Sequence, residues 1–287
     1  MSGDTHPEES DPSDDAVGGG ARDGVPGSDA LAELVDAADD LPLGERWVPT
    51  LPPVELDQAI AELASLSLAG TSLTDVVRQV ATLAQASIPG ADEVSITLVE
   101  GAKAHTVAFT GDLAAQLDER QYDEGSGPCM DAARQGGTVP LFDLGRDLDD
   151  HRRYPRFVDA ARRAGVTGSL SVGMAVPSRV VGALNMYARG DGSGLGPSSV
   201  PAAEAFAGYA ATTLANAHLL HSAQRVAEQM KAALVSRATI EQAKGVLMAR
   251  TGCTPDDAFA ELVRLSRSQN RKLAQVAAEL VAATSQR

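Results

Sequence analysis

The stretch LVSRATIEQAKGVLMARTGCTPDDAFAELVRLSRSQNRKLAQVAAEL, residues 234–280, decides how the rest of the chain is organised. Its apolar and small residues recur at steps of three and four, which predicts helices, and two short breaks divide it into three. Gly252 is a residue type that ends a helix. Thr254 and Pro255 are residue types that begin the next one, as N-cap and first helical residue. We expect Asn270 to close the second helix before the third begins.

The first of these helices extends upstream and covers roughly Ala202 to Arg250. Its apolar residues alternate steps of three and four, which is typical of a coiled-coil seam. The downstream seam consists of Ala223, Val226, Met230, Ala233, Arg237, Ile240, Lys244 and Leu247. The upstream seam consists of Phe206, Ala210, Thr213, Ala217 and Leu220. Two steps of three follow one another at Ala223, and such a stammer predicts a local change in winding.

Positive charge is concentrated in the C-terminal part of the chain. From residue 222 to residue 287 there are ten Lys or Arg against six Asp or Glu, whereas the whole chain has a net charge of −15. A basic helical region on an acidic protein is typical of a nucleic-acid-binding surface. A solvated helix surface has the same composition, so the charge alone leaves both interpretations open.

The identities of the residues favour the first interpretation. The run RATIEQAKGVLMAR, residues 237–250, is followed at fixed spacing by Ala258, Phe259, Leu262, Ser266, Asn270, Lys272, Leu273, Val276 and Ala277. In order, spacing and identity this pattern closely resembles the ANTAR domain, above all in Gln-Ala-Lys-Gly-x-Leu-Met. The resemblance implies a three-helix RNA-binding module of bacterial antitermination regulators, which we place at residues 221–283.

The same resemblance implies roles for individual residues. We expect contacts to RNA phosphates from the basic side chains of Arg237, Lys244, Arg250, Arg264, Arg271 and Lys272. Gln242, Ser266 and Asn270 have donors and acceptors that suit bases or sugars. Gly245 would allow close approach to the backbone, at a helix cost of about 1 kcal/mol relative to Ala. Met248 is a packing or stacking residue, and packing is the expectation for Leu247.

The N-terminal segment, residues 1–50, contains thirteen acidic residues and two arginines. Such a segment cannot bury enough apolar surface to offset the entropy of ordering, so we expect it to be disordered, with a transient helix at residues 30–38. A solubilising tail is the simpler interpretation. Competition with RNA for the basic surface is the alternative.

The middle of the chain, residues 55–220, combines helical and strand patterns. Helices are expected at residues 55–68 and, after a Ser72–Asp75 capping box, up to residue 88. Alternating residues predict two hairpins, at residues 94–110 and 169–187, with helices at 113–121, 129–134 and 154–164 between them, a short strand at 138–142 and a loop at 143–150. This order favours an α+β domain built on an antiparallel sheet with helices on one side.

The element order, with EGSGPC at residues 124–129 and GALNMY at residues 182–187, resembles a GAF domain. This small-molecule sensing fold precedes ANTAR in many actinobacterial proteins. The resemblance implies a ligand pocket between the sheet and residues 122–154, with no ligand or cofactor identifiable from the sequence. Its expected lining is Phe109, Cys129, Met130, Phe142, Tyr154, Phe157 and Met174. These residues would also serve simply as core.

Cys129 follows Pro128 at a predicted helix start, where a thiol pKa can be lowered. A redox or chromophore-attachment role and a small buried residue are both compatible with this position. His218 and His221 lie one turn apart, but no third ligand joins them at helical spacing, so no metal site is expected. No acid–base pair, nucleophile motif or P-loop is present, so we expect no enzyme. The absence of a long apolar run and of a leader, and the presence of only two cysteines, predict a cytoplasmic protein without a membrane span.

The sequence therefore predicts a regulator that senses an unknown signal, binds paired RNA stem-loops and prevents transcription termination. Two stem-loops require two copies of the small module, so we expect a homodimer through the long helix. A signalling scaffold that docks a protein partner through the basic helices is the alternative, and a DNA-binding repressor is a third interpretation.

Overall fold

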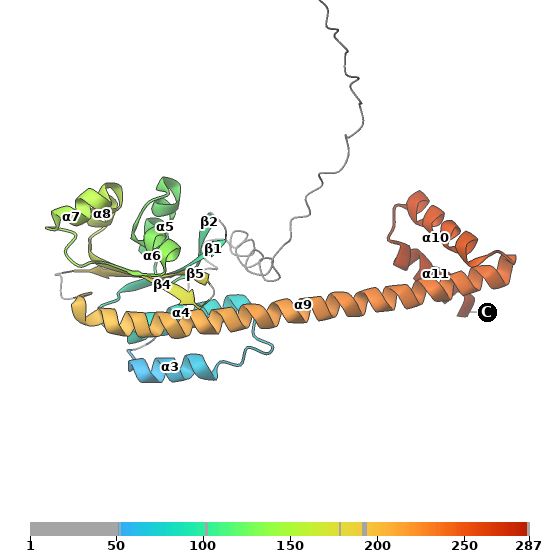
Figure 1. Ribbon diagram of the computed structural model, residues 1–287, viewed down its shortest axis with the longest axis horizontal. Coiled ribbons are helices and arrows are strands. Elements are labelled where there is room, and N and C mark those ends of the chain that lie inside the picture. Colours follow the sequence, from blue (N-terminus) through green and yellow to red (C-terminus); the bar gives the residue numbers. More distant parts are fainter. Residues whose placement is uncertain (1–50, 52, 101–102, 178, 191–193, 286–287) are drawn as a thin grey trace, which may run out of the picture.

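The computed structural model of this chain describes residues 51, 53–100, 103–177, 179–190 and 194–285 (Figure 1). Five strands form one sheet in the order β2-β1-β5-β4-β3, and every neighbouring pair is antiparallel. The strands are β1 (Glu93–Glu100), β2 (Lys103–Phe109), β3 (Thr138–Leu141), β4 (Val166–Val176) and β5 (Arg179–Arg189). Both predicted hairpins are confirmed. The predictions for residues 1–50 lie outside the described residues.

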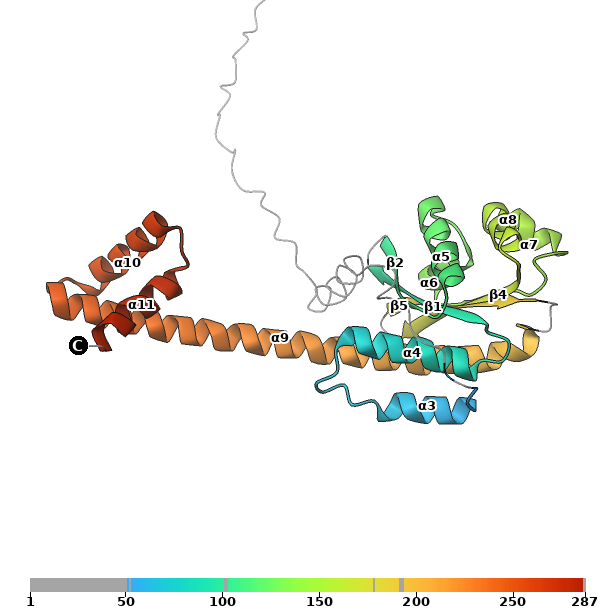
Figure 2. The ribbon, with the colours of Figure 1, turned by 180° about the vertical axis from the view of Figure 1, so that it is seen from behind.

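Helices cover both faces of the sheet (Figures 1 and 2). On one face lie α3 (Leu56–Ser65), α4 (Leu73–Ser87) and the first part of α9 (Val200–Thr251), which follows a short 3-10 turn at Pro197–Ser199. On the other face lie α5 (Asp112–Glu124), α6 (Pro128–Gln135), α7 (Leu148–Arg153) and α8 (Pro155–Arg163). The expectation of helices on one side was wrong, because β5 is buried on both faces from Val181 to Ala188.

Beyond the sheet, α9 continues as a single helix to a three-helix unit completed by α10 (Pro255–Gln269) and α11 (Leu273–Ser285). The residues predicted to begin and end α10 are confirmed. The Thr254 Oγ1 accepts a hydrogen bond from the Asp257 N–H (3.2 Å), and Asn270 closes α10 in the left-handed region with φ 50°. The Ser72 cap of α4 is also confirmed, since its Oγ accepts a hydrogen bond from the Asp75 N–H (3.1 Å).

The start of α9 corrects the predicted dimer seam. Phe206, Ala210 and Ala217 have no exposed surface and belong to the core between the sheet and α3 and α4. The upstream seam therefore packs inside the protein. The two consecutive steps of three at Ala223 are for this reason not a stammer in a coiled coil. The short helix α7 was also missed, because residues 143–150 were assigned to a loop.

Candidate functional site

The three-helix unit has a small core. Its core cluster contains one completely buried side chain from each helix, namely Ala243, Leu262 and Ala277, and Ala258 of α10 is completely buried as well. Partly buried apolar residues surround these three: Ile240, Leu247, Leu273, Leu280 and Val281. Leu247 is thus a packing residue, as expected. A core of this size leaves most of the surface of the unit available to another molecule.

Three cations that we assigned to RNA phosphates are held by carboxylates of the same unit. The pairs are Lys244 with Glu241 (3.0 Å), Arg264 with Glu261 (2.6 Å) and Arg271 with Glu279 (2.6 Å). Hydrogen bonds from the arginines lower the pKa of Glu261 and of Glu279. At least one partner of each pair is exposed, and Lys244 itself is half-buried. Ion pairs at the surface contribute little to stability, so a phosphate can replace the carboxylate.

The other three predicted cations, Arg237, Arg250 and Lys272, are exposed and form no ion pair with any residue that the structure describes. Arg250 lies in the last turn of α9. Lys272 lies in the turn between α10 and α11. These side chains can meet a phosphate without displacing a carboxylate.

Two more of the residues predicted to bind RNA are located at the turn between α10 and α11. The Ser266 Oγ–H donates to the Arg271 carbonyl (2.5 Å), and the Arg271 N–H donates to the Ser266 carbonyl (3.1 Å). Asn270 lies between them with positive φ. Ser266 therefore shapes the turn that presents Asn270 and Lys272. Gln242 is exposed on α9.

Gly245 is exposed in the middle of a helix, and a Cβ added there would meet nothing within 4 Å. Packing inside the protein therefore gives no reason for a glycine, although a helix interior disfavours it by about 1 kcal/mol relative to Ala. A glycine at this site instead suits the close approach of another molecule. Met248, three residues further along the same helix, is half-buried.

The other end of the protein contains a buried polar cluster on the sheet face under α5 and α6. Strand side chains of β1, β2 and β5 meet residues of the two helices there. The cluster consists of Ser95, Thr97, Thr106, Asp118, Gln121, Tyr122, Cys129, Asn185 and Tyr187. Only Cys129 was predicted as a site residue. The available signal was the run of hydroxyl residues at alternate positions of β1, which resembles a solvent-facing pattern.

Asp118 is the only charged side chain of this cluster. Its carboxylate accepts hydrogen bonds from the hydroxyls of Tyr187 (2.6 Å) and Thr106 (2.8 Å), and from the Asn185 amide (3.4 Å). All three donors are neutral. Burial raises the pKa of Asp118 from 3.8 to about 6, against the opposing effect of these hydrogen bonds.

Cys129 is completely buried beside Thr97 and Asn185, with its Sγ 3.2 Å from the Thr97 Oγ1 and from the Asn185 Nδ2. Burial, and then the charge of Asp118, raises the pKa of the thiol well above its ordinary value. A reactive cysteine needs a lowered pKa and access to solvent. Of the two interpretations of Cys129, the geometry supports the small buried residue.

Three buried polar atoms near this cluster have no hydrogen-bond partner among the described residues: the hydroxyls of Ser169 and Ser171 and the Oδ1 of Asn185. Ser171 pairs with Asn185 in the β4–β5 register, so two of these atoms lie on neighbouring strands. Buried polar atoms of this kind are normally satisfied by protein, water or ligand.

The predicted pocket residues do not share one space. Phe109, Cys129, Tyr154 and Phe157 pack together on the α5–α8 side of the sheet, whereas Met174 packs on the α3–α4 side and Phe142 against that second cluster. Met130 is buried on α6. A surface depression of about 650 Å³ lies elsewhere, at the loop after β3 and the end of α8, and includes Phe142, Arg146 and Arg162.

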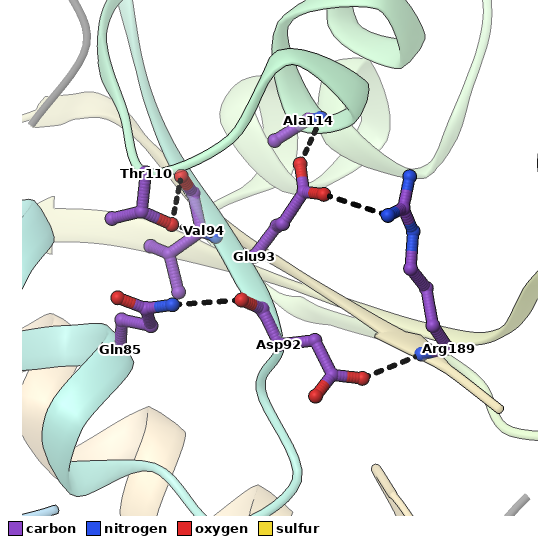
Figure 3. A network of polar contacts seen from close by, with 7 residues as sticks. All are labelled: Gln85, Asp92, Glu93, Val94, Thr110, Ala114 and Arg189. Atoms are coloured by element: carbon purple, nitrogen blue, oxygen red, sulfur yellow. Dashed lines mark hydrogen bonds and ion pairs between the residues drawn. The ribbon is translucent and has the colours of Figure 1, made fainter. Parts of the chain in front are cut away.

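A network of polar contacts fixes the end of the sheet where β1 begins and β5 ends (Figure 3). Glu93 accepts a hydrogen bond from the Ala114 N–H of α5 (3.0 Å) and pairs with Arg189 of β5 (3.5 Å). The neighbouring Asp92 accepts from the Arg189 N–H (2.7 Å) through its side chain and from Gln85 of α4 (2.7 Å) through its carbonyl. Helices on opposite faces of the sheet are therefore connected through two consecutive residues.

Within the described part of the chain, no three His, Cys, Asp or Glu side chains are grouped so that they could hold a metal ion. His218 is buried, and the Nε2 of His221 lies 2.9 Å from the Thr71 carbonyl. None of the described helices combines the length and the apolar character that a membrane crossing requires.

Comparison with known families gives two matches. The model of the GAF domain matches residues 70–215, and the model of the ANTAR domain matches residues 228–281. No curated protein matches the chain.

Several solved structures are similar to the chain. One is the photoproduct state of GAF3 from Slr1393 of Synechocystis sp. PCC6803, at 15% identity over 53% of this chain and 99% of that chain, with a TM-score of 0.41. A second is the GAF domain from a phosphoenolpyruvate-protein phosphotransferase of Coxiella burnetii, at 18% identity over 60% and 94%, with a TM-score of 0.40. A third is the GAF domain/HD domain protein from Geobacter sulfurreducens, at 17% identity over 54% and 99%, with a TM-score of 0.43.

Proposed function

We propose that this chain, which belongs to the GAF domain family and carries an ANTAR domain after it, is an RNA-binding regulator that prevents transcription termination. The ANTAR domain would bind paired stem-loops of nascent transcripts in the cytoplasm, and the GAF domain would receive the signal. The observation that carries this proposal is the set of cations on the three-helix unit, within the residues that match ANTAR.

The charges of this surface suit RNA. Arg237, Arg250 and Lys272 offer exposed positive charge, and Lys244, Arg264 and Arg271 are held by carboxylates that a phosphate can replace. RNA loops also expose bases, which need donors and acceptors at short range. Gln242 and Asn270 supply such donors and acceptors. Gly245 has no side chain that would keep RNA away from the backbone of α9.

The buried polar cluster is the place where the GAF domain would respond to a signal. The unsatisfied atoms of Ser169, Ser171 and Asn185 would be satisfied by a small polar ligand admitted between the sheet and α6. A shift of α5 would reach α4 through Glu93, Asp92 and Gln85, and α4 packs on α9. In a homodimer, this movement would change the spacing of the two ANTAR domains.

The test is binding of the purified full-length protein to a two-hairpin RNA leader, with duplex DNA of the same length as competitor. Replacing Arg250 and Lys272 together by Ala should weaken RNA binding about tenfold or more, because two phosphate contacts are lost. Arg163→Ala, an exposed arginine of α8 in the GAF domain, is the matched control and should bind RNA like the wild type.

Two results would contradict the proposal. Equal affinity for RNA and DNA would favour general binding to nucleic acid. No binding to either at low salt, together with capture of an acidic protein, would favour the alternative in which the basic helices dock a protein partner.

A further inference from the structure

One face of α9 is covered by nothing that the structure describes. It follows the helix in unbroken steps of four and three, and we call it the α9 stripe. Its residues, all exposed, are Ala205, Tyr209, Thr212, Asn216, Leu219, Ala223, Val226, Met230 and Ala233. Steps that alternate in this way keep a seam facing a second helix when the two helices supercoil.

The α9 stripe is distinct from the face of α9 that packs on the sheet. Phe206, Ala210 and Ala217 are each one residue further along than Ala205, Tyr209 and Asn216, and they are buried. One residue is about 100° around a helix, so the stripe lies beside the buried face and remains open. The stripe continues past the GAF domain, where the helix runs alone toward α10 and α11 (Figures 1 and 2).

The stripe exposes large apolar side chains. Tyr209, Leu219, Val226 and Met230 retain 52%, 60%, 49% and 63% of their surface, and Leu234 beside them retains 70%. From Ala223 to Val235 every residue except Arg225 is exposed. Apolar surface gathered along one line of an isolated helix is typical of a protein interface.

The positions of the charged residues on α9 indicate which kind of partner can bind the α9 stripe. Between Val200 and Ser236 the charged residues are Glu204, Arg225, Glu228 and Lys231, and none lies on the stripe or on the heptad positions that flank it; the next position of the seam is Arg237, where the uncharged stripe ends. A second, identical stripe can therefore pack against the first without repulsion between like charges. RNA does not fit this surface, because the stripe has no cation for its phosphates.

Asn216 is a residue of the stripe that can distinguish a parallel partner helix from an antiparallel one. It is exposed, and it occupies a position that would be central to the seam. In a parallel, in-register pair it faces the same residue of the other copy, and each amide can donate to the other's carbonyl. In an antiparallel or shifted pair it would not face a second Asn216 and would lose this reciprocal hydrogen bond, which is how a buried Asn specifies register in coiled coils.

We propose that the α9 stripe binds a second copy of this chain in parallel, and that the pairing of Asn216 with Asn216 of the partner subunit fixes the register. This inference rests on the homodimer of the proposed function and specifies its interface. Both GAF domains then lie at one end of the dimer and both ANTAR domains at the other.

The test uses full-length protein with Cys253→Ser, which removes the half-exposed native thiol. Val226→Cys places a thiol on the stripe, and Glu228→Cys places one off it. Under mild oxidation, Val226→Cys should form a disulfide-linked dimer about tenfold faster than Glu228→Cys, because a parallel pair brings only seam residues within disulfide reach. Adding Asn216→Leu should reduce this rate severalfold and produce mixed oligomers in light scattering, since the register is no longer specified.

Equal rates for the two cysteines, or a monomer in light scattering, would overturn the inference. Crosslinking that occurs only after removal of residues 1–50 would also overturn it, since the stripe would then be covered by that segment in the full chain. RNA titrations on the same samples separate the two proposals. A monomer that binds RNA contradicts the homodimer and its interface but not RNA binding, whereas a crosslinked parallel dimer that does not bind RNA contradicts RNA binding alone.

Discussion

The GAF domain buries a set of polar groups inside its core, whereas the ANTAR domain keeps its polar groups on the surface. In the GAF domain, Asp118 and Asn185 are completely buried against the sheet. In the ANTAR domain, the core consists of small and apolar side chains around Leu262, and the cations, such as Arg250, lie on the surface. The first arrangement changes only if the interior rearranges, whereas the second is ready to meet a partner. This difference suits a sensor in one case and a binding surface in the other.

The largest effect is expected in the GAF core. Phe206→Ala should lower the free energy of unfolding by about 3–5 kcal/mol, because the ring is completely buried between α9 and the sheet. Denaturant unfolding followed by circular dichroism measures this loss. Gln224→Ala, exposed on the same helix, is the control, and a loss below about 1 kcal/mol for Phe206→Ala would show that the two layers are loosely packed.

The effect of a similar truncation in the ANTAR domain should be confined to that domain. Leu262→Ala should destabilise this domain by about 2–5 kcal/mol, since its core has few other members. Hydrogen exchange should then be faster in α10 and α11 but unchanged in the sheet. Phe259→Ala is the control on the same helix, since that ring is 44% exposed. Faster exchange throughout the sheet would mean that the two domains unfold as one unit.

The buried carboxyl should give the GAF domain a distinctive dependence on pH. Because the pKa of Asp118 rises to about 6 on folding, the folded state holds its proton more tightly, and the resulting stability is complete below about pH 4 and lost as the pH rises to about 6. Relative to Asp118→Asn, the wild type should lose about 3 kcal/mol across this range. Asp123→Asn, exposed on the same helix, is the control. A constant difference between wild type and Asp118→Asn would show that the carboxyl is not buried in solution.

The smallest effect concerns two glycines of α9. Gly208→Ala and Gly245→Ala should each stabilise the helix by up to about 1 kcal/mol, since a Cβ meets nothing within 4 Å at either site. Only Gly245→Ala should also weaken RNA binding, because only that site lies in the ANTAR domain. Thermal melts and RNA titrations measure the two effects. Equal RNA affinities for the two variants would show that RNA does not approach the backbone closely at Gly245.

Local signals predicted most of the elements. Ser72, Thr254 and Asn270 mark helix ends through their own backbone or side-chain chemistry, so the sequence alone was sufficient there. The hairpins followed from residue alternation. The helix α7 was missed because it has six residues and none of them is buried, so no apolar period marks it.

Features that depend on distant contacts could not be predicted in this way. The hydroxyl residues at alternate positions of β1, Ser95 and Thr97, have a pattern typical of a solvent-facing strand face, although α5 and α6 cover them. The helix start at Cys129 favours a lowered thiol pKa, but burial has the larger effect. Likewise, the spacing of Phe206 and Ala210 suited a dimer seam, and only the packed sheet shows that this face is occupied.

The most direct test of the central proposal is the salt dependence of RNA binding. The logarithm of the affinity of the wild type for a two-hairpin RNA should fall linearly with the logarithm of salt concentration. Replacing Arg250 and Lys272 by Ala should reduce that slope by about 1.5–2, as expected for two lost phosphate contacts. An unchanged slope, with wild-type affinity, would show that this surface of the ANTAR domain does not bind RNA.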